Sequence, residues 1–421
     1  MTIVHAFRSK ATALACTPLL VLATAAAAGD GEAKVTSRDG VRHVLNPAIP
    51  AEPAETFDPR ALWQAGGEDD EAVFFGLIVS IDADPSGHTY LLDGQLSEVF
   101  VFDGEGNYLR SIGREGEGPG EFRRAGDLFV TPEGNVAIMQ RMPGKIVVLT
   151  PEGDPLGDYP TPRTPEGSPL FFESGGPAGD GVILATRTFA RKETGMEITE
   201  ALVRVDRSGE IQTTYREQAS SRDFANMVFD EKSSMPPAWA AGSDGTLYLS
   251  DDFDAYAIQV YGPDGTLAHV IERAYEHRKR SPEEMERFKP RVSIRRNDRS
   301  LQPESKASPT DRDVVQMFAR PDGTVWVLSS RGAFAASAGV IATFDVFDRE
   351  GRFVRQVSLR GEGSYRDDGI HLVGDRLYLV RGLRAARVAM FGLESGAEPD
   401  AEAEAMSVAC YDLGRIVQGQ R

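Results

Sequence analysis

The sequence has very little cysteine. Only Cys16 and Cys410 occur among the 421 residues, and Cys16 lies in an N-terminal apolar run that we expect to be removed. The single cysteine that remains excludes an intramolecular disulfide in the mature chain. A protein of this length without disulfides must be stabilised by its hydrophobic core. Its 41% of hydrophobic residues is enough to build one large domain.

Positive charge is also scarce. The chain has 46 Lys and Arg against 64 Asp and Glu, which gives a net charge of −18 at pH 7. A protein this acidic is repelled by phosphate backbones and by anionic membrane surfaces. We therefore expect no nucleic-acid partner. Beyond the N-terminal run, no apolar stretch is long enough to predict an integral membrane segment.

The motifs of common catalytic and metal sites are missing as well. No two of the six His stand at metal-ligand spacing, and neither HExxH nor G-x-S-x-G occurs. The stretch DADPSG, residues 82–87, lacks the third acidic ligand and the closing Glu of a calcium loop, so we interpret it as a hairpin turn. The Gly-rich stretch GREGEGPGEF, residues 113–122, has no Lys-Ser/Thr end and no helix after it, which excludes a phosphate loop. The sequence thus predicts no metal site and no cofactor.

The N-terminus has the pattern of an export signal. Arg8 and Lys10 precede the apolar run at residues 11–29, which ends in small residues suited to signal-peptidase cleavage near Ala28. We predict a signal peptide over residues 1–28 and a periplasmic or secreted mature protein. A lipoprotein anchored through Cys16 is the alternative, but Ala13 stands where such a signal has Leu.

An internal repeat organises the rest of the chain. Each copy has a strand, a Gly turn, a second strand, a polar gap, a third strand, another Gly turn and a fourth strand, most clearly at residues 80–113, 127–159 and 239–271. The first turns carry Gly87, Gly134, Gly181, Gly245, Gly323 and Gly374. The second turns carry Gly106, Gly153, Gly209, Gly265 and Gly351. The sequences around them, such as PSG, PEG and PDG, are typical of hairpins in which Gly takes the positive φ.

The strands between these turns predict the fold class. Segments such as HTYLLD, NVAIM and TVWVLS are apolar almost throughout, which indicates burial on both faces. Four-stranded antiparallel units with both faces covered are typical of propeller blades. We therefore predict an all-β, six-bladed β-propeller in a single domain, residues 29–421, with a pair of β-sandwiches as the alternative. The blades are expected near residues 80–113, 127–159, 172–215, 236–275, 313–360 and 369–413.

The Gly-rich stretch at 113–122 is then predicted to connect two blades, with Phe122 filling the seam between them. Together with TPEGNVAIM and KIVVLTPEGD, residues 131–139 and 145–154, it resembles the NHL-repeat group of six-bladed β-propellers. More closely, it resembles the exported bacterial six-bladed β-propeller proteins, over roughly residues 40–415. The resemblance implies a rigid ring with a central channel, used mostly for binding and in a few relatives for catalysis. The Asn-x-Arg that usually precedes the third strand of an NHL repeat is absent here.

Two further segments complete the predicted architecture. Residues 40–47 and 406–413 are strand-like, and we expect one or both to close blade six, because an open ring would leave an unpaired edge. Residues 272–312 form a charged insertion between blades four and five, with a short helix that starts at Ser281, Pro282 and Glu284. This insertion is either a solvated excursion or a basic docking surface or lid over one end of the channel. The basic residues of the second interpretation are Arg278, Lys279, Arg280, Arg295 and Arg296.

One polar position recurs in every copy, about six residues after the first-turn glycine, where the second strand ends. These positions are Asp93, Gln140, Arg187, Asp251, Ser329 and Arg381. In a propeller they would form a ring at one channel mouth, where the two Arg could bind a small polar or anionic ligand. The plainer interpretation is that strand ends are polar because they meet water. Arg141 and Arg331 adjoin the ring.

Two classes of function remain open. The absence of an assembled catalytic set favours an exported, non-catalytic protein that binds a protein, peptide or glycan ligand through one face or through the channel. The alternative is a hydrolase or lyase with a metal-dependent site in the channel. There a metal such as calcium would be held by Asp93, Asp251 or their neighbours.

Overall fold

The computed structural model describes residues 32–164, 170–223, 228–287, 294–296, 299–301, 304–391 and 405–414. All of them belong to the unit Gly31–Arg421. The signal peptide expected over residues 1–28 lies outside the described residues and stays a prediction. In the described part of the chain, no helix has the length and apolar character needed to span a membrane.

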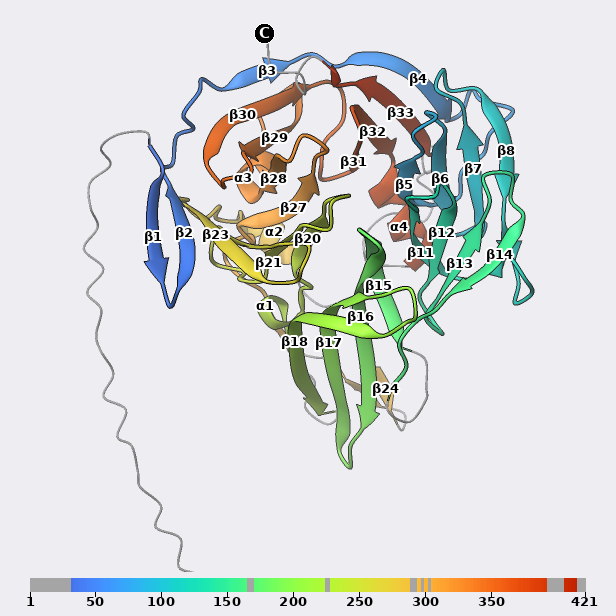
Figure 1. Ribbon diagram of the computed structural model, residues 1–421, viewed down its shortest axis with the longest axis horizontal. Coiled ribbons are helices and arrows are strands. Elements are labelled where there is room, and N and C mark those ends of the chain that lie inside the picture. Colours follow the sequence, from blue (N-terminus) through green and yellow to red (C-terminus); the bar gives the residue numbers. More distant parts are fainter. Residues whose placement is uncertain are drawn as a thin grey trace, which may run out of the picture. The chain divides into compact units, whose positions relative to one another are not determined.

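Six antiparallel sheets form a propeller ring, so the predicted fold class is confirmed (Figure 1). Blade one contains β5 (Ile78–Ala83), β6 (Thr89–Asp93), β7 (Glu98–Phe102) and β8 (Tyr108–Ile112). Blade two contains β11 (Ala125–Val130), β12 (Val136–Gln140), β13 (Lys145–Leu149) and β14 (Pro155–Tyr159). Blade three contains β15 (Phe171–Ala178), β16 (Gly181–Arg191), β17 (Gly195–Val205) and β18 (Ile211–Asp223).

The other three blades follow the same strand order, and each gains strands from the N-terminal segment. Blade four contains β20 (Ala238–Ala241), β21 (Leu247–Ser250), β22 (Ala257–Tyr261) and β23 (Leu267–Arg273). Blade five contains β27 (Val314–Ala319), β28 (Val325–Ser329), β29 (Val340–Phe347) and β30 (Phe353–Arg360). Blade six contains β31 (Gly369–Val373), β32 (Arg376–Arg381) and β33 (Ser407–Asp412), completed by β4 (Arg60–Gly66).

The second strand of each blade explains why the repeat packs as a ring. Every residue of β6, β12, β21 and β28 is buried, which accounts for their continuous apolar sequences. The hairpin turns of the blades, between first and second strands and between third and fourth strands, need glycine for two reasons. Gly87 has a φ of 91°, which a residue with a Cβ rarely adopts. Gly106 has a φ of 85°, and a Cβ there would also overlap the ring of Trp63.

The connector between blades one and two packs into the space between them, as predicted for Phe122. Phe122 is fully buried in a cluster that joins Tyr90 and Leu92 of blade one to Val136 and Ile138 of blade two. Its connector forms a short parallel pair, β9 (Arg114–Glu115) with β10 (Glu121–Phe122). The Gly-rich stretch at 113–122 therefore serves packing between blades.

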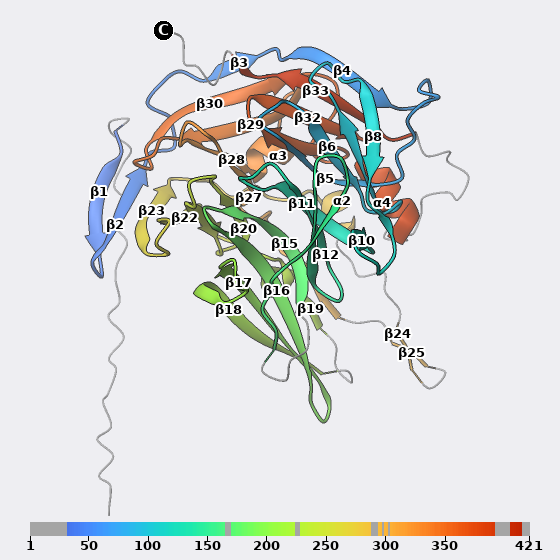
Figure 2. The ribbon, with the colours of Figure 1, turned by 45° about the vertical axis from the view of Figure 1, so that its right-hand side comes forward.

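The expected closure by residues 40–47 is wrong, whereas the expected closure by residues 406–413 is right. β33 pairs with β32 on one side and antiparallel with β4 on the other, so residues 60–66 complete blade six. β2 (Val41–Asn46) instead runs parallel to β23 on the outer edge of blade four, with β1 (Lys34–Arg38) beside it. β3 (Glu55–Phe57) runs parallel to β30 on blade five. The N-terminal segment thus covers the outer edges of three successive blades (Figures 1 and 2).

A buried Asn explains why residues 40–47 stop at blade four. The Nδ2 of Asn46 donates to the carbonyl oxygens of Glu272 (3.1 Å) and Gly351 (2.9 Å), and its Oδ1 accepts from the N–H of Phe353 (2.8 Å). These bonds hold the segment between blades four and five. The strand that closes the ring therefore comes later in the chain.

The charged insertion contains α2 (Pro282–Arg287), β24 (Ile294–Arg296), β25 (Arg299–Leu301) and β26 (Glu304–Lys306). β26 pairs in parallel with β19 (Val228–Asp230), which leads into α1 (Glu231–Ser234). The predicted cap of α2 is present: Ser281 Oγ accepts from the N–H of Glu284 (3.2 Å), and Glu284 Oε2 accepts from the N–H of Ser281 (2.8 Å).

Candidate functional site

The two ends of the propeller are built differently. At one end, which we call the turn side, short turns such as residues 84–88 join the first and second strands of each blade. At the other end, the helix side, the second strands of blades five and six lead into α3 (Ser330–Phe334) and α4 (Leu383–Phe391). The insertion leaves β23 at this same end, because a fourth strand ends where the next first strand begins. The first strands of all six blades line the channel between the two ends.

The six positions predicted from the repeat lie on the helix side. Asp93 pairs with Ile78, Gln140 with Ala125, Arg187 with Phe171 and Ser329 with Val314, each at or near the start of a first strand. Asp251 follows β21 directly, and Arg381 ends β32. The six residues are therefore equivalent backbone positions. The expectation that each ends the second strand is wrong for Arg187, because β16 continues to Arg191.

The side chains of the first two positions form hydrogen bonds with nearby backbone groups. Asp93 is fully buried, and its carboxylate accepts backbone N–H groups at 2.7–3.1 Å. Those donors are Gly76, Leu77, Gln95 and Leu96. Gln140 is also buried; it accepts from the N–H of Arg123 (2.9 Å) and donates to the carbonyl of Pro143 (2.8 Å).

The other four positions also have partners within the protein. Arg187 pairs with Glu173 (3.1 Å) and Glu200 (2.6 Å). Asp251 pairs with Arg216, and Ser329 caps α3 by accepting from the N–H of Gly332. Arg381 Nη1 lies 3.9 Å from a carboxylate oxygen of Glu362. Ligand binding by these six side chains stays a prediction.

The helix-side cavity lies in the channel. It has a volume of about 660 Å³ and is lined by β5, β27, α3, β31, α4 and the connector before β31. Its lining includes Phe334, Tyr365, Arg366, His371, Arg384 and Arg387. Burial raises the pKa of Tyr365 to about 12. Burial, with the nearby charge of Arg387, lowers the pKa of His371 to about 4, so His371 is neutral at pH 7.

Arg387 on α4 and Arg141, which directly follows β12, form no ion pair among the described residues. The same holds for the exposed Arg124, whose carbonyl accepts from the N–H of Arg141 (3.3 Å). Arg141 lies against Gly126 at the start of β11, where a Cβ would overlap its Nε. The pKa of Arg387 is lowered by burial and then by the charge of Arg141. The two cations are therefore close enough to repel each other at the channel mouth.

Ion pairs hold the charged insertion against the helix side. Arg280 pairs with Glu231 of α1 (2.7 Å) and with Asp311 (2.6 Å), and its side chain is only 3% exposed. Glu284 of α2 pairs with Arg278 (2.7 Å) and with Arg366 of the last connector (2.5 Å).

The prediction that Arg278 and Arg280 belong to a basic docking surface is therefore wrong, because both form ion pairs with carboxylates inside the protein. Lys279 is exposed. The side chains of Arg295 and Arg296 lie outside the described ones.

The turn-side cavity has a volume of about 560 Å³, and the first strands of all six blades line it. Asp82 accepts from the N–H of Val130 in blade two (2.7 Å), and Asp127 accepts from the N–H of Gly175 in blade three (3.1 Å). Ser80 donates its hydroxyl to Asp127 (2.6 Å). Burial raises the pKa of Asp82 to about 6, with a smaller contribution from the charge of Asp127. Burial also raises the pKa of Asp127.

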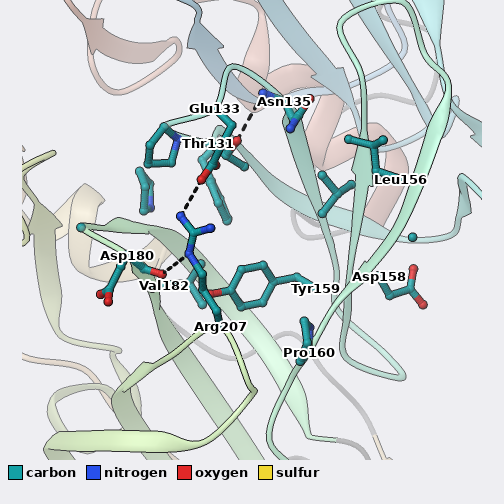
Figure 3. Close-up of a pocket in the computed structure, with 17 residues that line it drawn as sticks. Thr131, Glu133, Asn135, Leu156, Asp158, Tyr159, Pro160, Asp180, Val182 and Arg207 are labelled. Atoms are coloured by element: carbon teal, nitrogen blue, oxygen red, sulfur yellow. Dashed lines mark hydrogen bonds and ion pairs between the residues drawn. The ribbon is translucent and has the colours of Figure 1, made fainter.

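A third, smaller cavity of about 270 Å³ lies between blades two and three on the turn side. Figure 3 shows Arg207 between Glu133 and Asp180 at its edge. Arg207 pairs with the Glu133 carboxylate (2.5 Å) and donates to the Asp180 carbonyl (3.1 Å). The charges at this cleft are therefore already matched across the seam.

Sequence reasoning missed most of the charged residues that line the channel. Arg387, Arg320, Asp82 and Asp127 were not selected, although Arg141 was noted beside the predicted ring. A usable signal was present, because Asp82 and Asp127 are charged residues inside otherwise apolar first strands. Across the described ranges, no three His, Cys, Asp or Glu side chains are grouped as ligands for a metal ion.

Comparisons with known proteins agree with the six sheets. A family described as 6-bladed beta-propeller matches residues 73–158, which hold blades one and two. No curated protein matches the chain.

Similar solved structures include a Bacteroides fragilis protein whose name calls it exported, at 12% identity and a TM-score of 0.45, covering 87% of this chain and 99% of that one. Another is virginiamycin B lyase of Staphylococcus aureus, at 11% identity and a TM-score of 0.38, covering 83% and 98%. A third is a gluconolactonase of Xanthomonas campestris, at 13% identity and a TM-score of 0.41, covering 87% and 99%.

Proposed function

We propose that this six-bladed β-propeller is an exported, non-catalytic binding protein that holds an acidic peptide segment of a partner at the helix-side mouth of its channel. The observation that carries the proposal is the pair of unmatched guanidinium groups, Arg141 and Arg387, beside a cavity of about 660 Å³. Export is supported by the N-terminal signal pattern.

In a protein this rich in carboxylates, arginines without an ion pair in the described part of the chain, such as Arg141 and Arg387, suggest an anionic ligand. With a net charge of −18, carboxylates are abundant, and most Arg side chains on the helix side have one as partner. The charge of Arg141 acts on Asp127, but the two form no ion pair among the described residues. Arg141 and Arg387 repel each other, and an anionic ligand would relieve that repulsion. A carboxylate that binds both groups would form charge-assisted hydrogen bonds, each worth about 1.5–3 kcal/mol.

Exposed apolar side chains at the same end favour a peptide over a glycan. Met142 follows Arg141 directly and is 41% exposed; Met390 stands one helical turn after Arg387 and is 45% exposed. Leu96, at the end of β6 that faces this side, is 39% exposed. Met and Arg are enriched in protein–protein interfaces, and Met adapts its shape to different partners. A segment that combines Asp or Glu with apolar residues would match this surface.

The metal-dependent hydrolase or lyase gains no specific support. The carboxylate of Asp93 is saturated by backbone N–H groups, and that of Asp251 is paired with Arg216. Metal analysis of the purified protein addresses this class directly, because one equivalent of calcium or zinc per chain would favour it.

The proposal is tested by fluorescence anisotropy with labelled peptides that alternate Glu and Leu. We expect the Arg141→Gln/Arg387→Gln double variant to bind at least about tenfold more weakly than the unaltered protein, since two charge-assisted contacts are lost. A Lys–Leu peptide and soluble polygalacturonate serve as comparison ligands.

The matched control is Arg207→Gln/Arg349→Gln. Arg349 lies in the turn between β29 and β30 and donates to the carbonyl of Asp322 (3.1 Å). This control removes the same charge from the turn side and should leave peptide binding unchanged. Equal affinity of both double variants for the Glu–Leu peptide would contradict the proposal. So would a preference for polygalacturonate, which would make the ligand a glycan.

A further inference from the structure

Arg320 is a buried cation at the turn side. Two of its guanidinium nitrogens have no hydrogen-bond acceptor among the described residues. Arg320 follows β27 and lines the turn-side cavity, yet only 4% of the residue is exposed. Its Nε and Nη2 atoms are buried without a hydrogen-bond acceptor. Its guanidinium packs over the ring of Trp326, 5.4 Å from the centroid. A cation–π contact offsets part of the cost of burial but supplies no acceptor for these N–H groups.

The nearest acidic groups do not satisfy Arg320. The charges of Asp322 and Asp375 act on it and partly oppose the lowering of its pKa by burial. Asp322, however, accepts from the N–H of Thr324 (2.9 Å) and from its hydroxyl (2.7 Å) within the turn. Neither carboxylate forms a hydrogen bond or ion pair with Arg320 among the described residues. An Arg remains charged even when its pKa falls in this way, so an acceptor is missing.

The two unmatched groups have a defined geometry. The Nε–H and one Nη2–H of a guanidinium point the same way, which is the arrangement that binds the two oxygens of a carboxylate side by side. The amide of Gln316 and the ring of Trp239 also line the cavity. The carboxyl groups of Asp82 and Asp127 line it too, and the hydroxyl of Ser80 donates to Asp127 (2.6 Å).

We propose that the turn-side cavity is a second binding site, for a small organic carboxylate that pairs with Arg320. This cavity adjoins the helix-side cavity, with which it shares Val315, Gln316 and His371. The cavity of about 560 Å³ is large enough for a molecule the size of a sugar acid or dicarboxylate. Because Nε and Nη2 are covered by protein, the ligand must draw the guanidinium towards the cavity and off the ring of Trp326. Binding therefore changes the environment of a buried tryptophan.

The test is calorimetric titration with succinate, galacturonate, phosphate and sulfate, followed in parallel by tryptophan fluorescence. We expect at least one carboxylate to bind the unaltered protein with a Kd below about 10 mM and to change its tryptophan emission. Arg320→Met should lose at least about tenfold in affinity, and Arg320→Lys, which keeps the charge but not the paired donors, should lose most of it.

The Arg141→Gln/Arg387→Gln variant separates this site from the proposed function. It should bind the carboxylate as the unaltered protein does, while Arg320→Met should keep its affinity for the Glu–Leu peptide. Undiminished carboxylate binding by both Arg320 variants would overturn the proposal. Failure of every carboxylate to bind at about 10 mM, or tighter binding of phosphate or sulfate, would overturn it too.

Discussion

The helix side and the turn side of the channel hold buried carboxyl groups in opposite ways. On the helix side, burial raises the pKa of Glu284, but hydrogen bonds from Arg278, the backbone of Ser281 and Arg366 outweigh it and lower the pKa to about 2. On the turn side, Asp82 accepts only backbone N–H groups, and burial raises its pKa to about 6. The difference shows that the insertion supplies an arginine for Glu284, whereas Asp82 is placed in a first strand with backbone partners alone.

The ion pairs of the insertion provide the strongest test of this contrast. We expect Arg280→Met to lower the free energy of unfolding by about 4 kcal/mol, because it leaves the buried carboxylates of Glu231 and Asp311 without this cation. Urea denaturation measures the loss. The control is Lys232→Met, whose pair with Asp254 is nearly half exposed and should contribute about 0.5 kcal/mol. Similar losses in both variants would mean that the insertion is a solvated excursion.

Asp82 should give the turn side a stability that falls as the pH rises. Its pKa is about 6 in the folded protein and 3.8 in the unfolded chain, so the folded state binds the proton more tightly. The resulting stabilisation is complete below about pH 4 and disappears as the pH rises through 6. Between pH 4 and pH 8, the unaltered protein should lose about 2.5 kcal/mol more than Asp82→Asn. Parallel stability curves for the two proteins would show that Asp82 is not desolvated.

Glu284 should behave in the opposite direction. Its pKa is about 2 in the folded protein and 4.5 in the unfolded chain, so its stabilisation is present above pH 4.5 and is lost as the pH falls towards 2. Between pH 7 and pH 3, the unaltered protein should lose about 2 kcal/mol more than Glu284→Gln, measured by denaturation at each pH. An equal loss in both would mean that Arg278 and Arg366 do not stabilise the carboxylate.

Much of the fold could be predicted from local sequence. The glycines of the two hairpin turns, the buried second strands, the role of Phe122 in the seam and the cap of α2 all depend on neighbouring residues. The closure of blade six could not be predicted in the same way, because β4 and β33 are about 350 residues apart in the chain. Residues 60–66 were not predicted as a strand, and the bonds of Asn46 hold residues 41–46 beside blades four and five.

The channel was harder to predict than the ring. The repeat placed Asp93 and its five equivalents at one end of the ring, but a polar residue at a strand end can bind a ligand or its own backbone. Both carboxylate oxygens of Asp93 accept hydrogen bonds from the backbone N–H groups of residues 76, 77, 95 and 96. Arg141 and Arg387 come from blades two and six, and nothing local indicates that they are neighbours.

The sequence by itself determined the module, because hairpin turns and apolar strands are short-range properties that each copy repeats. The tertiary structure alone decided which strand closes the ring, which arginines are neutralised by carboxylates and which are left without a partner. Pairing of charges depends on distances across the channel and on burial, and these arise only when six copies pack around a common axis.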